Sequence, residues 1–214
     1  MTKGNILEYG VNEEICDYVM TSIIPMYDGF DKGHSREHAF HVISEALTLS
    51  KHYEADPDMV FVAAACHDIG LVKDRATHHL VSEKMILEDR NLERWFTEEQ
   101  IVTIAHAARD HRASSDREPE TIYGRLIAEA DRQIVPETVI RRTILYGMDH
   151  YPELDSEGHW RRMLSHLEEK YSERGYLKLW IKESRNADNL RVLRDMIKDK
   201  NVLRRIFDET FKEV

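Results

Sequence analysis

The run from Met59 to Cys66 constrains the fold more than any other stretch of this sequence. It consists of eight consecutive apolar residues. Asp56 and Pro57 stand directly before it and are typical of an N-cap followed by proline at the first helical position, while Gly70 beyond it is a natural helix terminator. Because a helix that is apolar on all sides must be covered on all sides, the sequence predicts a central, buried helix with other elements packed around it.

The other expected elements are helices as well. Apolar residues recur at helical spacing along most of the chain, and no alternation of apolar and polar residues is long enough to favour a sheet. Thr97 and Gln100 have the spacing of a capping box. We expect helices, besides the central one, over residues 12–24, 36–52, 79–89, 97–108, 122–130, 137–148, 157–172 and 187–212.

The length of the chain favours one core. A chain of 214 residues is long enough for one domain with a substantial core and short for two independent ones. We therefore expect an all-α fold in which residues 1–148 form a helical bundle. Residues 149–214 are expected to form a C-terminal helical extension that packs on the same core and is not independent.

Composition excludes several classes of protein. With 33% charged and 42% hydrophobic residues, the chain is typical of a globular protein. A formal net charge of -10 disfavours a nucleic-acid polymer as partner. The longest apolar run is too short to cross a bilayer and the first residues lack a signal-peptide pattern, so we expect no membrane and a cytoplasmic location. Cys16 and Cys66 lack CxxC spacing and are expected to be reduced.

His67 and Asp68 stand at the end of the central helix. An ionised Asp68 there loses hydration and also faces the negative end of the helix dipole. A divalent cation removes both penalties, because it takes Asp68 as an anion and His67 as a neutral imidazole. The alternative is an Asp that caps a neighbouring helix and a His bonded to a backbone carbonyl, and the pair alone does not decide between them.

Two more residues point to the same interior. His38 precedes Val42 by four residues on the core-facing side of its helix, and Asp131 follows Ile127 by four residues on another apolar stripe. Together with His67 and Asp68 they would place two carboxylates and two imidazoles on buried faces, which is costly without a shared partner. The sequence therefore predicts that the four side chains converge on one ion.

These residues resemble a known family in their order and context. The segments HSREHAFHVISEA, AACHDIG and IAEADR are similar to those of the HD-domain superfamily of metal-dependent phosphohydrolases, over about residues 20–135. The resemblance implies an HD-type helical bundle in which His38, His67, Asp68 and Asp131 hold a divalent metal. It also implies hydrolysis of a phosphate ester by a metal-activated water, with Asp68 able to bridge to a second ion and to orient that water.

Two further histidines favour a second ion. His78 falls where binuclear branches of the superfamily carry an extra ligand, and His106 lies four residues after Val102, where another is expected. His79 adjoins His78, so the choice between them stays open. The alternative for His78 and His79 is a solvated helix start, and the alternative for His106 is core packing. One or two ions of Mn, Fe, Mg, Zn, Ni or Co fit this set. Two neighbours of His38 are not expected to be ligands: His34 and His41.

Cations follow each of these segments in the sequence. We expect Lys73, Arg75 and Arg112 to contact a small phosphorylated substrate such as a nucleotide, and His111 to act as the acid for the leaving group. Taken singly, such cations are more often ordinary helix-surface charges. The glycine-rich signature of cyclic-dinucleotide phosphodiesterases is absent after His106, as is the acidic pair of alarmone hydrolases, so neither activity is favoured.

Two other functions stay open. Some relatives in the same superfamily hold two irons with six such ligands and activate dioxygen, and the number of ligands does not separate that binuclear iron oxygenase from a hydrolase. A non-catalytic helical module stabilised by metal is the third reading, although an intact ligand set argues against it. The oligomeric state is open, with a homodimer allowed.

Overall fold

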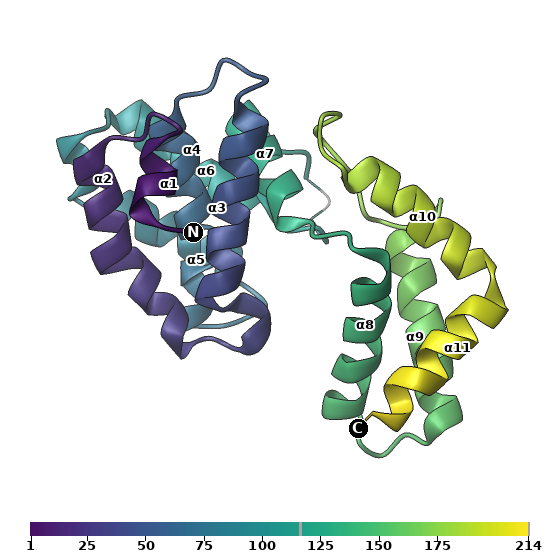
Figure 1. The fold of residues 1–214 in the computed structure, drawn as a ribbon. Coiled ribbons are helices and arrows are strands. Elements are labelled where there is room, and N and C mark those ends of the chain that lie inside the picture. Colours follow the sequence, from purple (N-terminus) through teal and green to yellow (C-terminus); the bar gives the residue numbers. More distant parts are fainter. Residues whose placement is uncertain (116, 214) are drawn as a thin grey trace. The chain divides into compact units, whose positions relative to one another are not determined.

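The computed structural model describes residues 1–115 and 117–213 (Figure 1), and within them it contains eleven α-helices and no strand. The prediction of an all-α fold is confirmed. The described chain divides into two compact units. The first comprises residues 1–132 together with 180–184, and the second comprises residues 133–179 and 185–213.

The first unit is built around α4 (Pro57–Cys66). Asp56 caps this helix by accepting a hydrogen bond from the backbone N–H of Asp58, and every residue from Met59 to Cys66 is buried. The predicted central helix is therefore confirmed. The α-helices packed against it are α3 (Arg36–Ser50), α6 (Glu98–Asp110) and α7 (Ile122–Asp131).

Shorter elements complete the first unit. The sequence did not predict α1, and the helix expected over residues 12–24 is divided, because its backbone changes from α-helical to π-helical hydrogen bonding at Val19. The remaining elements are α1 (Lys3–Leu7), α2 (Glu13–Tyr18), the π-helical turn η1 (Val19–Ile23), α5 (His78–Glu88), and four 3₁₀ turns, η2 (Ile24–Gly29), η3 (Lys32–His34), η4 (Ile69–Val72) and η5 (Leu92–Arg94).

Gly70 has a different role from the one predicted. The helix α4 already ends at Cys66, and Gly70 lies in η4, where a Cβ atom would stand 2.0 Å from the carbonyl oxygen of His78 and 2.6 Å from the backbone nitrogen of Ser82. Its N–H donates to Ser82 Oγ at 2.9 Å. Gly70 is thus not a helix terminator, and the missing side chain lets the first turn of α5 approach the end of α4.

The second unit has buried apolar residues of its own. Its helices are α8 (Pro136–His150), α9 (Ser156–Tyr171), α10 (Asn186–Lys198) and α11 (Lys200–Lys212), and α8 packs against α9 and α11. The helix expected over residues 187–212 is broken at Asp199. Its carboxylate accepts hydrogen bonds from the backbone N–H groups of Asn201 and Val202 and so starts a new helix.

The division into units differs from the expected boundary. The sequence places residues up to 148 with the bundle, whereas the units divide after Arg132 and α8 lies in the second. The hydrophobic cluster of the first unit contains none of the apolar residues buried in α8 to α11. Each unit therefore has buried apolar residues of its own, and the packing of the C-terminal helices on the first core stays a prediction.

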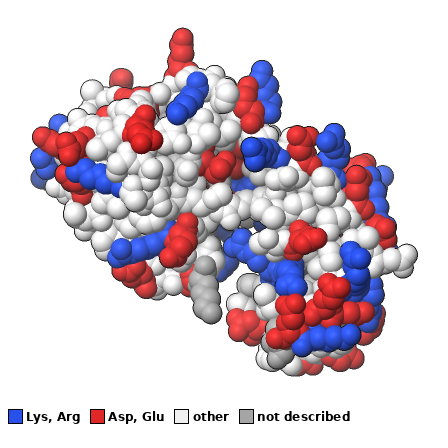
Figure 2. Space-filling view, in the orientation of Figure 1, with Lys and Arg blue, Asp and Glu red and all other residues white. Residues whose placement is uncertain are grey.

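The surface of the described chain is mixed in charge. In Figure 2, Lys and Arg are interspersed with Asp and Glu over the face in view. No described helix combines the length and the apolar character that crossing a membrane would need.

Candidate metal centre

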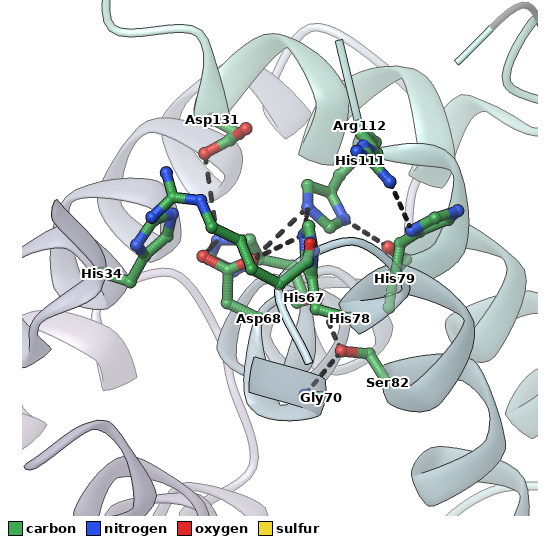
Figure 3. A network of polar contacts seen from close by, with 12 residues as sticks. His34, His67, Asp68, Gly70, His78, His79, Ser82, His111, Arg112 and Asp131 are labelled. Atoms are coloured by element: carbon green, nitrogen blue, oxygen red, sulfur yellow. Dashed lines mark hydrogen bonds and ion pairs between the residues drawn. The ribbon is translucent and has the colours of Figure 1, made fainter. Parts of the chain in front are cut away.

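Six ionisable side chains gather at helix ends in the first unit (Figure 3). His38 stands in the first turn of α3 and His78 is the first residue of α5. The other four stand at carboxyl ends of helices: His67 and Asp68 after α4, His111 after α6 and Asp131 as the last residue of α7. Carboxyl ends carry partial negative charge, which favours a cation at this point.

Asp68 divides the cluster into two groups. Its Oδ2 lies 3.1 Å from Nε2 of His67 and 3.7 Å from Nε2 of His38. Its Oδ1 lies 3.3 Å from Nε2 of His78 and 3.4 Å from Nε2 of His111. The two oxygens of one carboxylate thus face two different sets of donors, His38, His67 and Asp68 on one side and Asp68, His78 and His111 on the other.

Asp131 adds a donor to the first group. Its Oδ1 lies 3.1 Å from Nε2 of His38 and 3.9 Å from Nε2 of His67. The Asp131 side chain is 24% exposed, whereas those of His67 and Asp68 are buried. The first group therefore has four donors and an accessible side at Asp131, and the second group has three.

Backbone carbonyls fix the orientation of three of the four imidazoles. Each ring donates a hydrogen bond from Nδ1 to the carbonyl oxygen three residues earlier: His67 to Ala64, His78 to Arg75 and His111 to Ala108. Since a carbonyl only accepts, Nδ1 carries the hydrogen and Nε2 is free to present a lone pair to the cluster. At His67 and His111 the acceptors are helix-end carbonyls, which lack a partner within the helix.

The donor set fits a divalent metal. Nε2 of His38 lies 3.3 Å from Nε2 of His67, and Nε2 of His78 lies 3.1 Å from Nε2 of His111. In the second pair both Nδ1 hydrogens are bonded to carbonyls, so two Nε2 lone pairs face each other and repel unless a cation is shared between them. Neutral imidazole and carboxylate are ligands that suit Mn, Fe, Co, Ni and Zn, so each group can hold one such ion.

The electrostatics of the cluster favour the same conclusion. Burial by itself would lower the pKa of His67, but the carboxylates of Asp68 and Asp131 outweigh it and raise that pKa to about 9. Burial opposes ionisation of Asp68, yet the neighbouring His67 and His111 hold its pKa well below the usual range. The cluster therefore keeps its carboxylate charged and favours a positive charge beside it, which a bound divalent metal would supply.

The structure does not bring His106 to this cluster. Its Nδ1 lies 3.1 Å from Oε2 of Glu120 and its Nε2 lies 3.6 Å from Oε1 of Glu83. His111, predicted as an acid, occupies the second group instead. The physical reason is helical rotation, because five residues turn the side-chain direction by about 140° beyond a full turn, and His106 consequently faces away from the centre.

The structure brings His78, and not His79, to the centre. Nδ1 of His79 lies 3.5 Å from a guanidinium nitrogen of Arg112. Sequence reasoning missed Ser82, a buried residue whose hydroxyl donates to the carbonyl oxygen of His67 at 2.8 Å and accepts the N–H of Gly70. The position of Ser82, one helical turn after His78, is the sequence feature that could have indicated its role.

The expected substrate contacts differ in their surroundings. Arg112 is half-buried and donates to the carbonyl oxygen of Ala76. Arg75 is exposed and pairs with Asp31 at 3.0 Å. Lys73 is exposed and has no ion pair with a residue of the described chain. The two residues expected to be mere neighbours, His34 and His41, belong to neither donor group.

Comparison with known proteins gives one match. Residues 35–133 match the family model described as the HD domain, and this span contains all six residues of the two groups. Comparisons with curated proteins and with solved structures gave no significant match.

Proposed function

We propose that this chain, whose residues 35–133 match the HD-domain model, is a member of the HD-domain superfamily and hydrolyses a phosphate ester of a small molecule such as a nucleotide. Members of this superfamily are generally metal-dependent phosphohydrolases. The observation that carries the proposal is Asp68, whose two oxygens face two donor groups that could each hold a divalent metal.

The roles of the residues follow from this geometry. His38, His67, Asp68 and Asp131 would hold one ion, and Asp68, His78 and His111 a second. Bound divalent ions polarise a phosphoryl oxygen and lower the pKa of water. Asp68 stands between the two groups, where its carboxylate can accept a hydrogen bond from the attacking water and orient it. The three-donor group leaves more coordination positions for substrate than the four-donor group.

His111 changes role in this proposal. Its Nδ1 hydrogen is bonded to the carbonyl oxygen of Ala108, and its Nε2 faces Asp68 and His78. Neither nitrogen is free to donate a proton to a leaving group. We therefore assign His111 as a ligand and no longer as the acid.

The cations of the loop between η4 and α5 supply the contacts to the substrate. Lys73 and Arg75 are exposed there, and Arg112 holds the same loop through Ala76. Because the chain has a net charge of -10, a small phosphorylated molecule would be attracted by these local cations and the bound ions. The same net charge disfavours a nucleic-acid polymer.

The first test is hydrolysis under controlled oxygen. Metal content of the purified protein should be measured, and mononucleotides, dinucleotides and simple phosphomonoesters screened for phosphate release with Mn²⁺, Mg²⁺, Co²⁺ and Ni²⁺. We expect release that is equally fast with and without oxygen. The six-residue donor set also suits a binuclear iron oxygenase, so iron content with oxygen uptake and no phosphate release would overturn the proposal.

The second test concerns Asp68. Asp68→Ala should abolish turnover and remove at least part of the metal, because both groups lose a donor. Asp188→Ala is a control, since Asp188 is exposed in α10 and pairs only with Arg191 among the described residues. A protein without turnover that binds a small ligand equally well before and after Asp68→Ala would be a binding module.

A further inference from the structure

The loop 73–77 is tied to the segment before α3 by one ion pair. Nη1 of Arg75 lies 3.0 Å from Oδ2 of Asp31. The same carboxylate accepts the N–H of Gly33 at 2.8 Å and lies 3.0 Å from Nδ1 of His34. Asp31 is therefore held in place by its own segment, and Arg75 is the partner that can leave.

This ion pair stands between the segments that lead into the two donor groups. On one side, His34 is bonded to Asp31, and its ring lies 6.0 Å from that of His38, measured between centroids. On the other side, the carbonyl oxygen of Arg75 accepts the Nδ1 hydrogen of His78 at 2.7 Å. The backbone of Arg75 is thus bonded to a residue of the second donor group, and its guanidinium is bonded to the segment that precedes the first.

The pair is built weakly. The two side chains are 62% and 55% exposed, and exposed pairs of this kind contribute little to stability. A single guanidinium nitrogen contacts the carboxylate. A phosphate dianion can accept two parallel N–H bonds from one guanidinium and carries twice the charge of a carboxylate. It is therefore able to displace Asp31 from Arg75.

We infer that Arg75 is the receptor for the phosphoryl group of the substrate and that Asp31 competes with the substrate for it. This inference rests on the proposed function, because it requires a phosphorylated ligand at the centre. Asp31 then determines specificity: dianionic phosphate displaces it, whereas carboxylates and other monoanions do not. Asp31 also sets the concentration of phosphate at which the site fills.

Titration calorimetry with inorganic phosphate tests this on the full-length, Mn²⁺-loaded protein. The variants are Asp31→Asn, Arg75→Gln and the double variant. Asn keeps the ability to accept the N–H of Gly33, and Arg75→Gln leaves the backbone bond to His78 in place. Glu14→Gln is the matched control, since it removes an exposed carboxylate that pairs with Arg94. Arg94 precedes the amino end of α6, and the length of that helix, about 20 Å, separates this end from His111.

We expect Arg75→Gln to weaken phosphate binding by about 10-fold and Asp31→Asn to tighten it by about 2- to 5-fold. In the Arg75→Gln background, Asp31→Asn should have no effect, and Glu14→Gln should have none in either background. Metal content should stay unchanged in all variants. Equal tightening by Asp31→Asn with and without Arg75 would overturn the competition. If the metal-loaded wild type binds no phosphate, the proposed function fails and this inference with it.

Discussion

At the scale of single residues, the facing Nε2 atoms of His78 and His111 favour a cation between them most strongly. Bonds to backbone carbonyls hold the Nδ1 hydrogens of His67, His78 and His111, so these rings cannot turn without losing a buried hydrogen bond. The close approach of His78 to His111 is therefore built into the fold. Removing one ring of a pair should release the ion that both hold.

His111→Ala, at the residue that follows α6, and His106→Ala, within α6, form a matched pair of variants. His111→Ala should lose the second ion while keeping the first. Loss of an outer-shell partner lowers metal affinity by roughly 10- to 100-fold, and loss of a ligand should lower the affinity of the second group further. His106→Ala should keep both ions, since His106 contacts Glu83 and Glu120 instead. Elemental analysis after dialysis measures this. Loss of an ion from His106→Ala alone would contradict the arrangement described above.

The sequence predicted most, but not all, of the residues of the centre. His38, His67, Asp68 and Asp131 were identified because each stands on an apolar helical face or at its end. His106 was predicted as a ligand and His111 as an acid, whereas the structure places His111 in the second group. His111 follows the last turn of α6, and periodicity within the helix says nothing about a residue beyond its end. Asp31 carries no such signal, because its importance comes from a contact with a distant loop.

At the scale of elements, the position of α5 depends on Gly70. A methyl group at this position would collide with the backbone of α5, at 2.0 Å from the carbonyl oxygen of His78. Gly70→Ala should move α5 away from the centre, destabilise the fold by about 1–3 kcal/mol and weaken the second ion. Urea unfolding together with metal titration measures both effects.

Gly29→Ala is the control for this variant. Gly29 lies in η2 and has no atom within 4 Å of the position that a Cβ would take. This substitution should leave metal binding unchanged. If Gly70→Ala binds two ions as tightly as Gly29→Ala, the close approach at Gly70 does not position His78.

His166 in α9 leads us to expect that the stability of the fold depends on pH. Burial, followed by the positive charges of Lys170 and Arg162, lowers the pKa of His166 below 6.5 in the folded chain. The unfolded chain then binds a proton more readily, so the contribution of His166 to stability is complete above pH 6.5 and is lost as pH falls below it. Urea unfolding from pH 7.5 to 5 should show a smaller loss for His166→Gln than for wild type.

The control for His166 is His52→Gln, which changes an exposed histidine after α3. Its pH profile should follow that of wild type. Parallel profiles for wild type and His166→Gln would show that His166 does not contribute to the acid sensitivity of the second unit.

The helices themselves were largely predictable, and their breaks were less so. The N-cap at Asp56 and the capping box at Thr97 and Gln100 occur as the sequence indicated. The break at Asp199 was missed because no glycine or proline marks it and apolar residues continue at helical spacing on both sides. A single capping carboxylate decided it.

At the scale of the whole molecule, the sequence predicted a bundle that ends at residue 148, and the described chain divides into two units after Arg132. Amphipathic stripes show that a helix buries one face, but they do not show which helix covers it. The stripe of α8 was assigned to the first core, yet α8 packs against α9 and α11. The six residues of the two donor groups all belong to the first unit.

Removal of metal should therefore act on the two units differently. An ion present at about 100 times its dissociation constant stabilises the state that binds it by about 2.7 kcal/mol. Chelation should accelerate hydrogen exchange by up to about 100-fold for amides of α3 to α7 that exchange through opening of the first unit, and leave α9 to α11 unchanged. Exchange measured by mass spectrometry resolves these segments. An equal acceleration in both units would show that they unfold together, as a single shared core requires.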